Sequence, residues 1–427
     1  MRHRYPELIA GVIVTLLLIE LVPNVNADNN PTNGQTNLSA NLEWNRTWDT
    51  HLQEIAVSGD ISTNGPIILI DTFNDTTWTT EYVATVHYDT IGKFIWNNTW
   101  RNVINDIAAP TSLKVDKNNN FWIVGGINGT TGNTSDAFIL EYNGTGNFVN
   151  KKIYNFNNQD FFSELCIDNN SIYTIGATNG TTSGWTQEGI LIKMDMDGNI
   201  INKTILRIGE NTIFTSIIVN NGFVYVAGYT NITHPDIIIM KFDLDGKLIW
   251  NKIWDSGNSD WANSITIDKN GVIYVGGKSD GNSILLEYNL AGAFLTSQIL
   301  GTGDYTYVKI DSNGNILIGW TSNTLWPPSI SLKALDTPGT ELWTTSWKDT
   351  GYMVQITDII PSNNGSFYVT GSEGKLMSAE RAIILKYSQN TVPEFVTMIL
   401  PLTITIALFV VILRKIKRRD SEMPRSL

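Results

Sequence analysis

The sequence predicts an all-β fold, a seven-bladed β-propeller of four-stranded antiparallel blades, with an N-terminal signal segment and one C-terminal transmembrane helix. Three observations predict it. From residue 42 to residue 388 nearly the same order of short apolar runs and turns recurs seven times. Successive copies are about fifty residues apart, a period typical of propeller blades. Between the two end segments no stretch has the periodicity of a helix.

Each copy is expected to form four strands, and the clearest copy shows them well. Its first strand, at 264–268, ends in a tight Asn-Gly turn, and its second, at 273–276, is apolar and therefore buried on both faces. Glycines at the end of the second strand permit close backbone approach. The third strand follows at 284–288.

The fourth strand carries two tryptophans four residues apart. Residues i and i+4 of a strand lie on the same face, so these pairs are expected to pack between adjacent blades. They are Trp44 and Trp48, Trp96 and Trp100, Trp250 and Trp254, and Trp343 and Trp347.

The strand count predicts how the ring closes. Residues 42–48 form a fourth strand with no earlier strand beside it, whereas the last copy ends at its third strand, 382–388. The simplest solution is that the strand at 42–48 completes the last blade, which leaves no exposed sheet edge at the seam. The propeller is therefore placed at 42–388.

Both ends are expected to be membrane-related. Residues 1–27 have the basic start, apolar stretch and small residues of a signal peptide, with an uncleaved anchor as the alternative. An Asn-rich linker, 28–41, follows. After a linker at 389–395, the apolar run 396–413 would span about 27 Å as a helix. The basic tail, 414–427, stays cytoplasmic, so the propeller faces outward.

Residues 42–388 resemble the SBBP-type β-propeller repeat of bacterial and archaeal surface proteins. The resemblance rests on Ile-x-Ile-Asp-x-x-Gly-x-Ile-Tyr-Val-x-Gly, best seen at 265–277. The chain lacks the Thr-x-Ser-x-x-Phe-Pro ending common in that family, so a related family is equally compatible. Gly-Lys-x-x-Trp at 92–96 and 246–250 is also similar to quinoprotein-like propellers.

The residues before the C-terminal helix are similar to the PEF-type sorting signal of archaeal surface proteins. The motif is Pro393, Glu394 and Phe395, followed by an apolar helix and a basic cluster. The resemblance implies that an archaeosortase-type protease removes the helix and attaches the protein to a lipid. The alternative is a retained single-pass anchor.

Composition supports an extracellular glycoprotein at the outer membrane face. The chain has 29 Lys and Arg against 41 Asp and Glu, a formal net charge of −12, which disfavours nucleic acid as a partner. A single cysteine, Cys166, excludes a disulfide framework. A monomer is expected. Asn-x-Ser/Thr sequons make five loop asparagines glycosylation candidates: Asn74, Asn128, Asn133, Asn179 and Asn231.

No catalytic residue, metal site or cofactor is predicted. His51, His87 and His234 lie in different repeats without ligand spacing, and one cysteine cannot build a zinc site. Asp-x-Asp-Gly at 195–198 and 243–246 lacks the distal glutamate of a calcium loop. A structural Asx turn explains it, because sister repeats lack the second Asp.

The remaining signal is tryptophan among small polar residues in irregular loops. Such rings suit stacking on sugars or contact with a partner protein, although each could instead cap its own blade. The function predicted is a non-catalytic recognition or adhesion module for carbohydrate or protein. The alternatives are a propeller enzyme of quinoprotein-like or hydrolase type and a passive structural envelope component. The four candidate ligand-binding residues are Trp78, Trp185, Trp261 and Trp326.

Overall fold

The computed structural model describes one compact unit between Leu38 and Thr391. The described residues are 38–74, 79–101, 108–128, 134–157, 159–179, 186–231, 234–324, 326–375 and 380–391. Within them no helix has the length and apolar character needed to cross a membrane. The predicted signal peptide, the sorting motif, the C-terminal helix and the basic tail lie outside the described residues.

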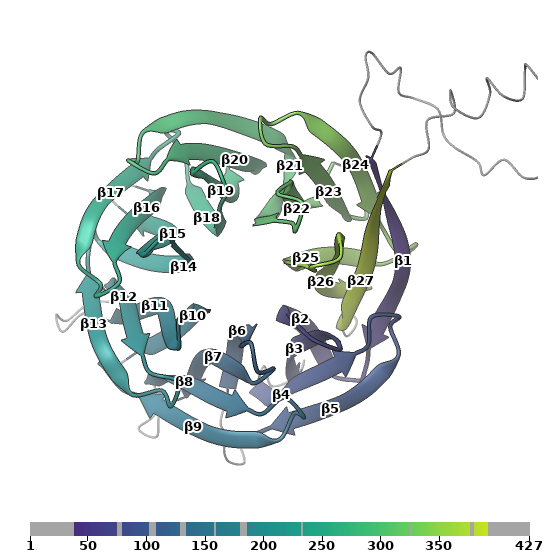
Figure 1. The fold of residues 1–427 in the computed structure, drawn as a ribbon, viewed down its shortest axis with the longest axis horizontal. Coiled ribbons are helices and arrows are strands. Elements are labelled where there is room, and N and C mark those ends of the chain that lie inside the picture. Colours follow the sequence, from purple (N-terminus) through teal and green to yellow (C-terminus); the bar gives the residue numbers. More distant parts are fainter. Residues whose placement is uncertain are drawn as a thin grey trace, which may run out of the picture. The chain divides into compact units, whose positions relative to one another are not determined.

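The unit is a ring of radially arranged sheets around a central opening (Figure 1). The prediction of an all-β fold built from repeated four-stranded antiparallel sheets is confirmed. The innermost strands are β2 (Gln53–Ser62), β6 (Ala108–Val115), β10 (Asp160–Asp168), β14 (Asn211–Asn220), β18 (Asp260–Ile267) and β25 (Met353–Pro361). The second strands are β3 (Gly65–Asn74), β7 (Phe121–Asn128), β11 (Ser171–Asn179), β15 (Phe223–Asn231), β19 (Val272–Ser279), β22 (Ile316–Ser322) and β26 (Ser366–Gly374).

The outer half of each sheet follows the same order. The third strands are β4 (Thr79–Tyr88), β8 (Ser135–Tyr142), β12 (Gln187–Met194), β16 (Pro235–Asp243), β20 (Asn282–Asn289), β23 (Ser329–Leu335) and β27 (Glu380–Thr391). The outermost strands are β5 (Phe94–Trp100), β9 (Phe148–Tyr154), β13 (Ile200–Leu206), β17 (Leu248–Trp254), β24 (Glu341–Trp347) and β1 (Leu38–Trp48).

One strand serves two blades, which the sequence did not predict. β21 (Phe294–Ile310) pairs with β20 through its first half and with β22 through its second half, so it is outermost in one blade and innermost in the next. Five four-stranded sheets and one seven-stranded sheet therefore make seven blades. We number them from blade 1 (β2–β5) to blade 7 (β25, β26, β27 and β1).

The first strand closes the ring. β1 pairs antiparallel with β27, from Leu38 opposite Thr391 to Trp48 opposite Ala382. This is the exchange that the surplus first strand and the missing last strand predict. The boundaries differ: β1 begins at Leu38, inside the predicted linker 28–41, and β27 runs past residue 388 to Thr391. The linkers are shorter because the ladder continues on both strands.

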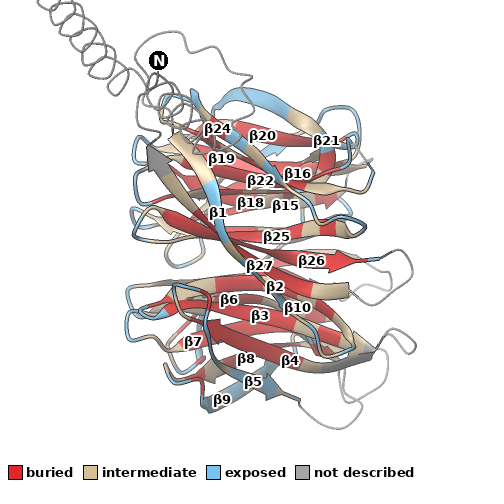
Figure 2. Ribbon diagram, turned by 90° about the vertical axis from the view of Figure 1, so that its right-hand side faces the viewer, coloured by how far each residue is buried: buried red, intermediate tan, exposed pale blue. Residues whose placement is uncertain are grey.

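The apolar core lies between blades rather than within them. Seven clusters of buried apolar residues are present, and each joins two neighbouring blades. The second strands are buried on both faces, as Ile67–Ile70 show with no exposed area. Figure 2 shows the buried inner strands and the exposed outer strands β5 and β9. Full burial of such a side chain contributes about 1.5–3 kcal/mol, so each blade depends on both neighbours.

A β-bulge near the axis links successive blades. Every innermost strand shifts register at the same level, for example between Phe214 and Ser216. The bulged hydroxyl donates to a carbonyl of the next blade: Thr111 to Phe162 at 2.8 Å, Ser163 to Phe214 at 2.5 Å, and Thr215 to Ala262 at 2.9 Å. Glycine is required on the second strand because a Cβ at Gly228 would meet the Ile213 carbonyl oxygen.

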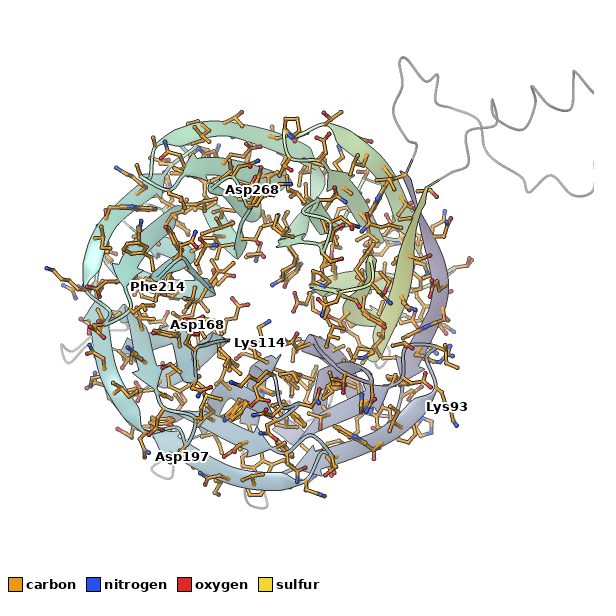
Figure 3. The ribbon with its side chains drawn as sticks, in the orientation of Figure 1. Lys93, Lys114, Asp168, Asp197, Phe214 and Asp268 are labelled. Atoms are coloured by element: carbon orange, nitrogen blue, oxygen red, sulfur yellow. The ribbon has the colours of Figure 1, made fainter. Side chains whose placement is uncertain are left out.

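Asx turns close the hairpins at the opposite end of the blades. In each, the side-chain oxygen accepts backbone N–H groups two and four residues ahead. The residues are Asp89, Asp116, Asn143, Asp195, Asp243, Asp268, Asn289 and Asp311. The two Asp-x-Asp-Gly segments are thus structural turns, and Asp197 lies on such a turn at the rim (Figure 3).

The glycine of the outer turn also binds the preceding blade. Gly246 has a φ of +77°, which L-residues rarely adopt, and its carbonyl accepts the Thr204 hydroxyl of blade 3 at 2.7 Å. Three further turns are held the same way: Gly92 by Arg46 at 2.7 Å, Gly146 by Asn98 at 2.6 Å, and Gly198 by Tyr154 at 2.6 Å.

The tryptophan pairs of the outermost strands pack as inter-blade spacers. Trp96 of blade 1 stacks on Phe121 of blade 2, with ring centroids 6.0 Å apart. Trp250 lies against Tyr225, and its indole N–H donates to the carbonyl of Leu290 in blade 5 at 3.3 Å. These indoles are committed to the scaffold.

The Asx turn at Asp195 tests whether these turns stabilise the fold. Asp195 accepts the N–H groups of Asp197 and Asn199 and the Asn199 amide. Asp195→Ala should lower the free energy of unfolding by about 0.5–1.5 kcal/mol, because the folded turn loses three hydrogen bonds whose exposed donors then bind water. Asp197→Ala, in the same turn but with an exposed side chain, is the control. Equal urea midpoints for the two variants would contradict the assignment.

Candidate functional site

The candidate site lies on the end of the ring opposite the Asx turns. In an antiparallel blade the start of the first strand, the end of the second and the start of the third share one end. We call this end the loop face. Two of the four predicted ligand-binding tryptophans are described, and both lie at the loop face: Trp261 at the start of β18 in blade 5, and Trp326 between β22 and β23 in blade 6. Trp78 and Trp185 lie outside the described residues.

Trp261 is fixed by a cross-strand partner. It is half-buried on β18 and pairs with Lys278 of β19, whose ammonium lies 5.9 Å from the indole centroid. A cation above an indole face is attracted by the ring quadrupole. Lys278 also forms an ion pair with Asp304 on β21 of blade 6. The indole, the ammonium and the carboxylate thus form a chain that crosses from one blade to the next.

The chain continues into the loop that carries Trp326. The Asn323 amide donates to the second oxygen of Asp304 at 2.8 Å, and the Asn323 N–H donates to the Thr302 carbonyl at 3.1 Å. Trp326 follows three residues later, before a cis proline, and is 73% exposed. We call Trp261, Lys278, Asp304, Asn323 and Trp326 the blade 5–6 site.

The β21 bulge shapes this region. Tyr305 has a φ of +55°, unusual for an aromatic residue, and is 43% exposed. It sits within the register shift between Asp304 and Tyr307, which turns Asp304 toward blade 5. Strain of this kind is found where the surrounding structure holds a functional side chain in place.

The blade 5–6 site brings together groups that can contact a ligand. It combines a largely exposed indole with a carboxylate, an ammonium and an amide held by one another. Flat apolar area beside fixed donors and acceptors suits ligands with both apolar faces and hydroxyl groups. None of the five residues is a nucleophile paired with a base. The polar partners were missed in the sequence because Lys278, Asp304 and Asn323 meet only through strand register.

The glycosylation candidates are distributed around the same face. Asn179 is buried, and its amide, the group that would carry a glycan, donates to Gln159 at 3.2 Å. Asn231 is half-buried at the end of β15. Asn133 and the side chains of Asn74 and Asn128 lie outside the described residues. Glycosylation of these sequons stays a prediction.

A second group of charged residues converges on the axis. Asp60, Lys114, Glu164, Lys309 and Asp358 come from five blades, and we call them the axial cluster. The Lys309 ammonium lies 3.9 Å from Glu164 and 3.5 Å from Asp358. Figure 3 shows Lys114 directed into the central opening. Burial alone lowers the pKa of Lys114, but the carboxylates of Asp60, Glu164 and Asp358 outweigh it and raise that pKa.

The carboxylates of the axial cluster are engaged by backbone. Glu164 accepts the Ile217 N–H at 2.8 Å, Asp60 accepts the Val115 N–H at 2.8 Å, and Asp358 accepts the Ile359 N–H at 2.8 Å. Burial and the Glu164 charge raise the pKa of the nearby Cys166 thiol, so it is protonated and a poor nucleophile. The cluster contains neither histidine nor arginine, and its contacts are those of a structural ion network.

One further group has the donors of a metal site. His234, Asp236 and Asp255 offer ligand atoms within 4.8 Å of one another on the loop face of blade 4. This grouping is not visible in the sequence, because Asp255 directly follows the adjoining strand β17 and meets His234 and Asp236 only through strand pairing.

Two loop-face carboxylates have strongly raised pKa values. Burial raises the pKa of Asp71 on β3 to about 7, and one of its oxygens accepts no hydrogen bond. Burial also raises the pKa of Glu373 on β26 to about 7, although Arg381 lies 2.7 Å away and opposes the rise. Both groups therefore favour the protonated form well above the range of a free carboxyl.

Removing the axial cation should destabilise the ring. Lys309→Met removes one of the two ammonium groups that face Glu164 and Asp358 and leaves Lys114 alone to balance three carboxylates, so the free energy of unfolding should fall by about 1–3 kcal/mol. The loss is smaller than for a fully buried pair, because these side chains keep 10–19% exposure. Urea unfolding measures it, with Lys309→Arg as the control. A stability equal to wild type would show that the network contributes nothing.

The raised pKa values predict a pH dependence with a definite sign. Below about pH 4 the two carboxyls are protonated in both folded and unfolded chains. Near pH 7 both carboxyls are already ionised in the unfolded chain, whereas in the folded chain they must lose their protons in buried positions. The stabilising contribution of the two protonated carboxyls is therefore lost as the pH rises through 7. The free energy of unfolding of the wild-type protein should fall between pH 5 and pH 8. This fall should be smaller in the double variant Asp71→Asn/Glu373→Gln. The exposed Asp197→Asn should keep the wild-type slope; an unchanged slope in the double variant would contradict the prediction.

Comparison with known proteins yields one repeat match and distant structural likenesses. No curated protein matches the chain. Among solved structures, a protein of unknown function from Dyadobacter fermentans DSM 18053 has a TM-score of 0.48 at 10% identity, covering 66% of this chain and 95% of that one. A luciferin-regenerating enzyme has a TM-score of 0.41 at 12% identity, covering 65% of this chain and 91% of that one.

A third structure is the subtype N11 neuraminidase-like protein of A/flat-faced bat/Peru. It has a TM-score of 0.42 at 12% identity, with 81% of this chain and 90% of that one covered. The repeat match is more specific. It begins at the end of β17, spans β18 and β19, and stops in β20, which confirms the resemblance drawn from the motif. Residues 253–284 match the model of the SBBP β-propeller repeat family.

Proposed function

We propose that this propeller is a non-catalytic recognition module that binds carbohydrate through the blade 5–6 site. One observation carries the proposal: Trp326, three residues along the chain from an ordered polar group, exposes 73% of its surface. Single exposed apolar side chains are common on protein surfaces, but an exposed indole offers a ligand a large flat face. Tryptophan adds contact area with little loss of conformational entropy, because it has only two side-chain torsions.

The polar partners support carbohydrate as the ligand class. Sugar hydroxyls both donate and accept hydrogen bonds, while the ring C–H faces stack on aromatics. Asp304 offers an acceptor, and Lys278 and Asn323 offer donors, within one connected group. Because these groups hold one another, little ordering entropy is lost when a ligand binds.

The setting we propose is the outer face of a cell membrane. The acidic composition, the signal-type N-terminus and the apolar C-terminal run before a basic tail support an extracellular module tethered at its C-terminal end. A lipid in place of that helix would give the same orientation.

Substitution of the tryptophans tests the proposal on the purified full-length chain. A glycan array identifies a ligand, and calorimetry measures its affinity. Trp326→Ala should weaken binding about tenfold or more, as for an aromatic anchor worth over about 1.4 kcal/mol. Trp261→Ala should weaken it less, because that ring is half-buried.

The control is Phe294→Ala, which removes an aromatic side chain that is 49% exposed on the outermost strand of blade 5. It should bind as wild type does. If no glycan binds, or if Trp326→Ala binds as tightly as wild type, the carbohydrate proposal is wrong. Binding to envelope proteins but not to glycans would instead support a protein ligand, and no binding to either would leave a passive envelope component.

A further inference from the structure

The third strand of blade 4 begins with an unusual set of ligand-type side chains. The Nδ1 atom of His234 lies 2.9 Å from Oδ1 of Asp236, and its Nε2 atom lies 3.9 Å from Oδ1 of Asp255. Asp236 is the second residue of β16, and Asp255 directly follows β17. Ile237 pairs with Trp254, so the next residues outward, Asp236 and Asp255, lie opposite each other on neighbouring strands.

The repeat supplies an internal comparison at this position. In five other blades the equivalent pair holds at most one carboxylate. The pairs are Tyr82 and Arg101 in blade 1, Asp136 and Asn155 in blade 2, Glu188 and Arg207 in blade 3, Ser329 and Lys348 in blade 6, and Arg381 and Asp49 in blade 7. Like charges directly opposite in a sheet are destabilising. Of these six described pairs, only that of blade 4 places two carboxylates together.

One oxygen of the buried carboxylate of this pair, Oδ1 of Asp236, accepts no hydrogen bond from the described residues. Asp236 exposes 4% of its side chain, and its Oδ1 faces the His234 Nδ1 without the alignment of a hydrogen bond. In blade 2 the equivalent Asp136 accepts the Asn155 amide at 2.7 Å. Among the described residues, Asp255 accepts the Gly257 N–H, at 2.6 Å, on its Oδ1.

We propose that His234, Asp236 and Asp255 bind one divalent first-row transition-metal ion, such as zinc. One imidazole and two carboxylates are ligands of this class, and three protein ligands leave a coordination position for water. Calcium takes six to eight oxygen ligands, so an imidazole among three side chains disfavours it. The ion would neutralise the two facing carboxylates and bind the Asp236 Oδ1 atom that accepts no hydrogen bond.

The site would also order a loop-face connection. Asp255 begins the connection to β18, and its next residue, Ser256, donates to Asp260 through both its N–H, at 2.8 Å, and its hydroxyl, at 2.9 Å. A bound ion would hold the start of the connection at Asp255, while the hydrogen bonds to Asp260 hold its other end. This inference does not depend on carbohydrate binding.

Zinc titration of the untagged full-length chain after chelator treatment tests the proposal. Wild type should bind one zinc ion by calorimetry, with a rise in thermal midpoint. Asp255→Asn recreates the acid–amide pair of blade 2, so it should fold normally yet bind zinc more than about tenfold more weakly, since even second-sphere changes weaken affinity by that much. His234→Gln should have a similar effect. Asp136→Asn, at the equivalent position of blade 2, should bind zinc as wild type does.

The outcomes separate clearly. Wild-type zinc affinity in both Asp255→Asn and His234→Gln would overturn the proposal, as would the absence of any zinc binding to wild type. A midpoint shift with calcium but not with zinc would also overturn it. If Asp255→Asn fails to fold, His234→Gln decides alone, because this side chain is 28% exposed and forms no backbone contact in the described ladder.

Discussion

The pairing of β1 with β27 is the constraint on which the ring depends. A blade has two faces that must be covered, and each apolar cluster is made by two blades. The cluster at the seam joins Ala56 of blade 1 to Ile360 and Tyr368 of blade 7. An open array would leave a face bare at each end. The eleven-residue strand β1 completes the last blade and brings those two faces together.

Contacts between blades are polar near the central axis and at the outer rim, and apolar in the region between the axis and the rim. Near the axis, bulge hydroxyls and the axial cluster bind across blades; at the rim, turn glycines accept donors from the preceding blade. Because repeating residues supply most of these contacts, they hold the scaffold. The residues that differ from blade to blade gather on the loop face. Asp255, where blade 2 has Asn155, and Lys278, where blade 1 has Asp71, are two such departures.

The parts of the fold predicted from sequence are those determined locally. The Asx turn at Asp195 and the paired indoles at Trp250 and Trp254 depend on residues a few positions apart, so their roles can be inferred without a structure. The fusion of blades 5 and 6 through β21 was not predicted, because Gly301, Gly303 and Asp304 are turn-type residues, yet pairing with β20 and then β22 keeps the strand continuous through them. The ion pair of Lys278 with Asp304 and the meeting of His234 with Asp255 depend on register between distant segments.

The exchange at the seam also sets an order of events during synthesis. The ribosome completes β1 first, yet its partner β27 emerges more than three hundred residues later. Domains generally form as the chain emerges, N-terminal parts first. Here β1 is synthesised first but has no partner strand until β27 of the last blade has been synthesised. Intermediate lengths of the chain therefore expose both a free strand and a free sheet edge, and a chain truncated before β27 has no way to close.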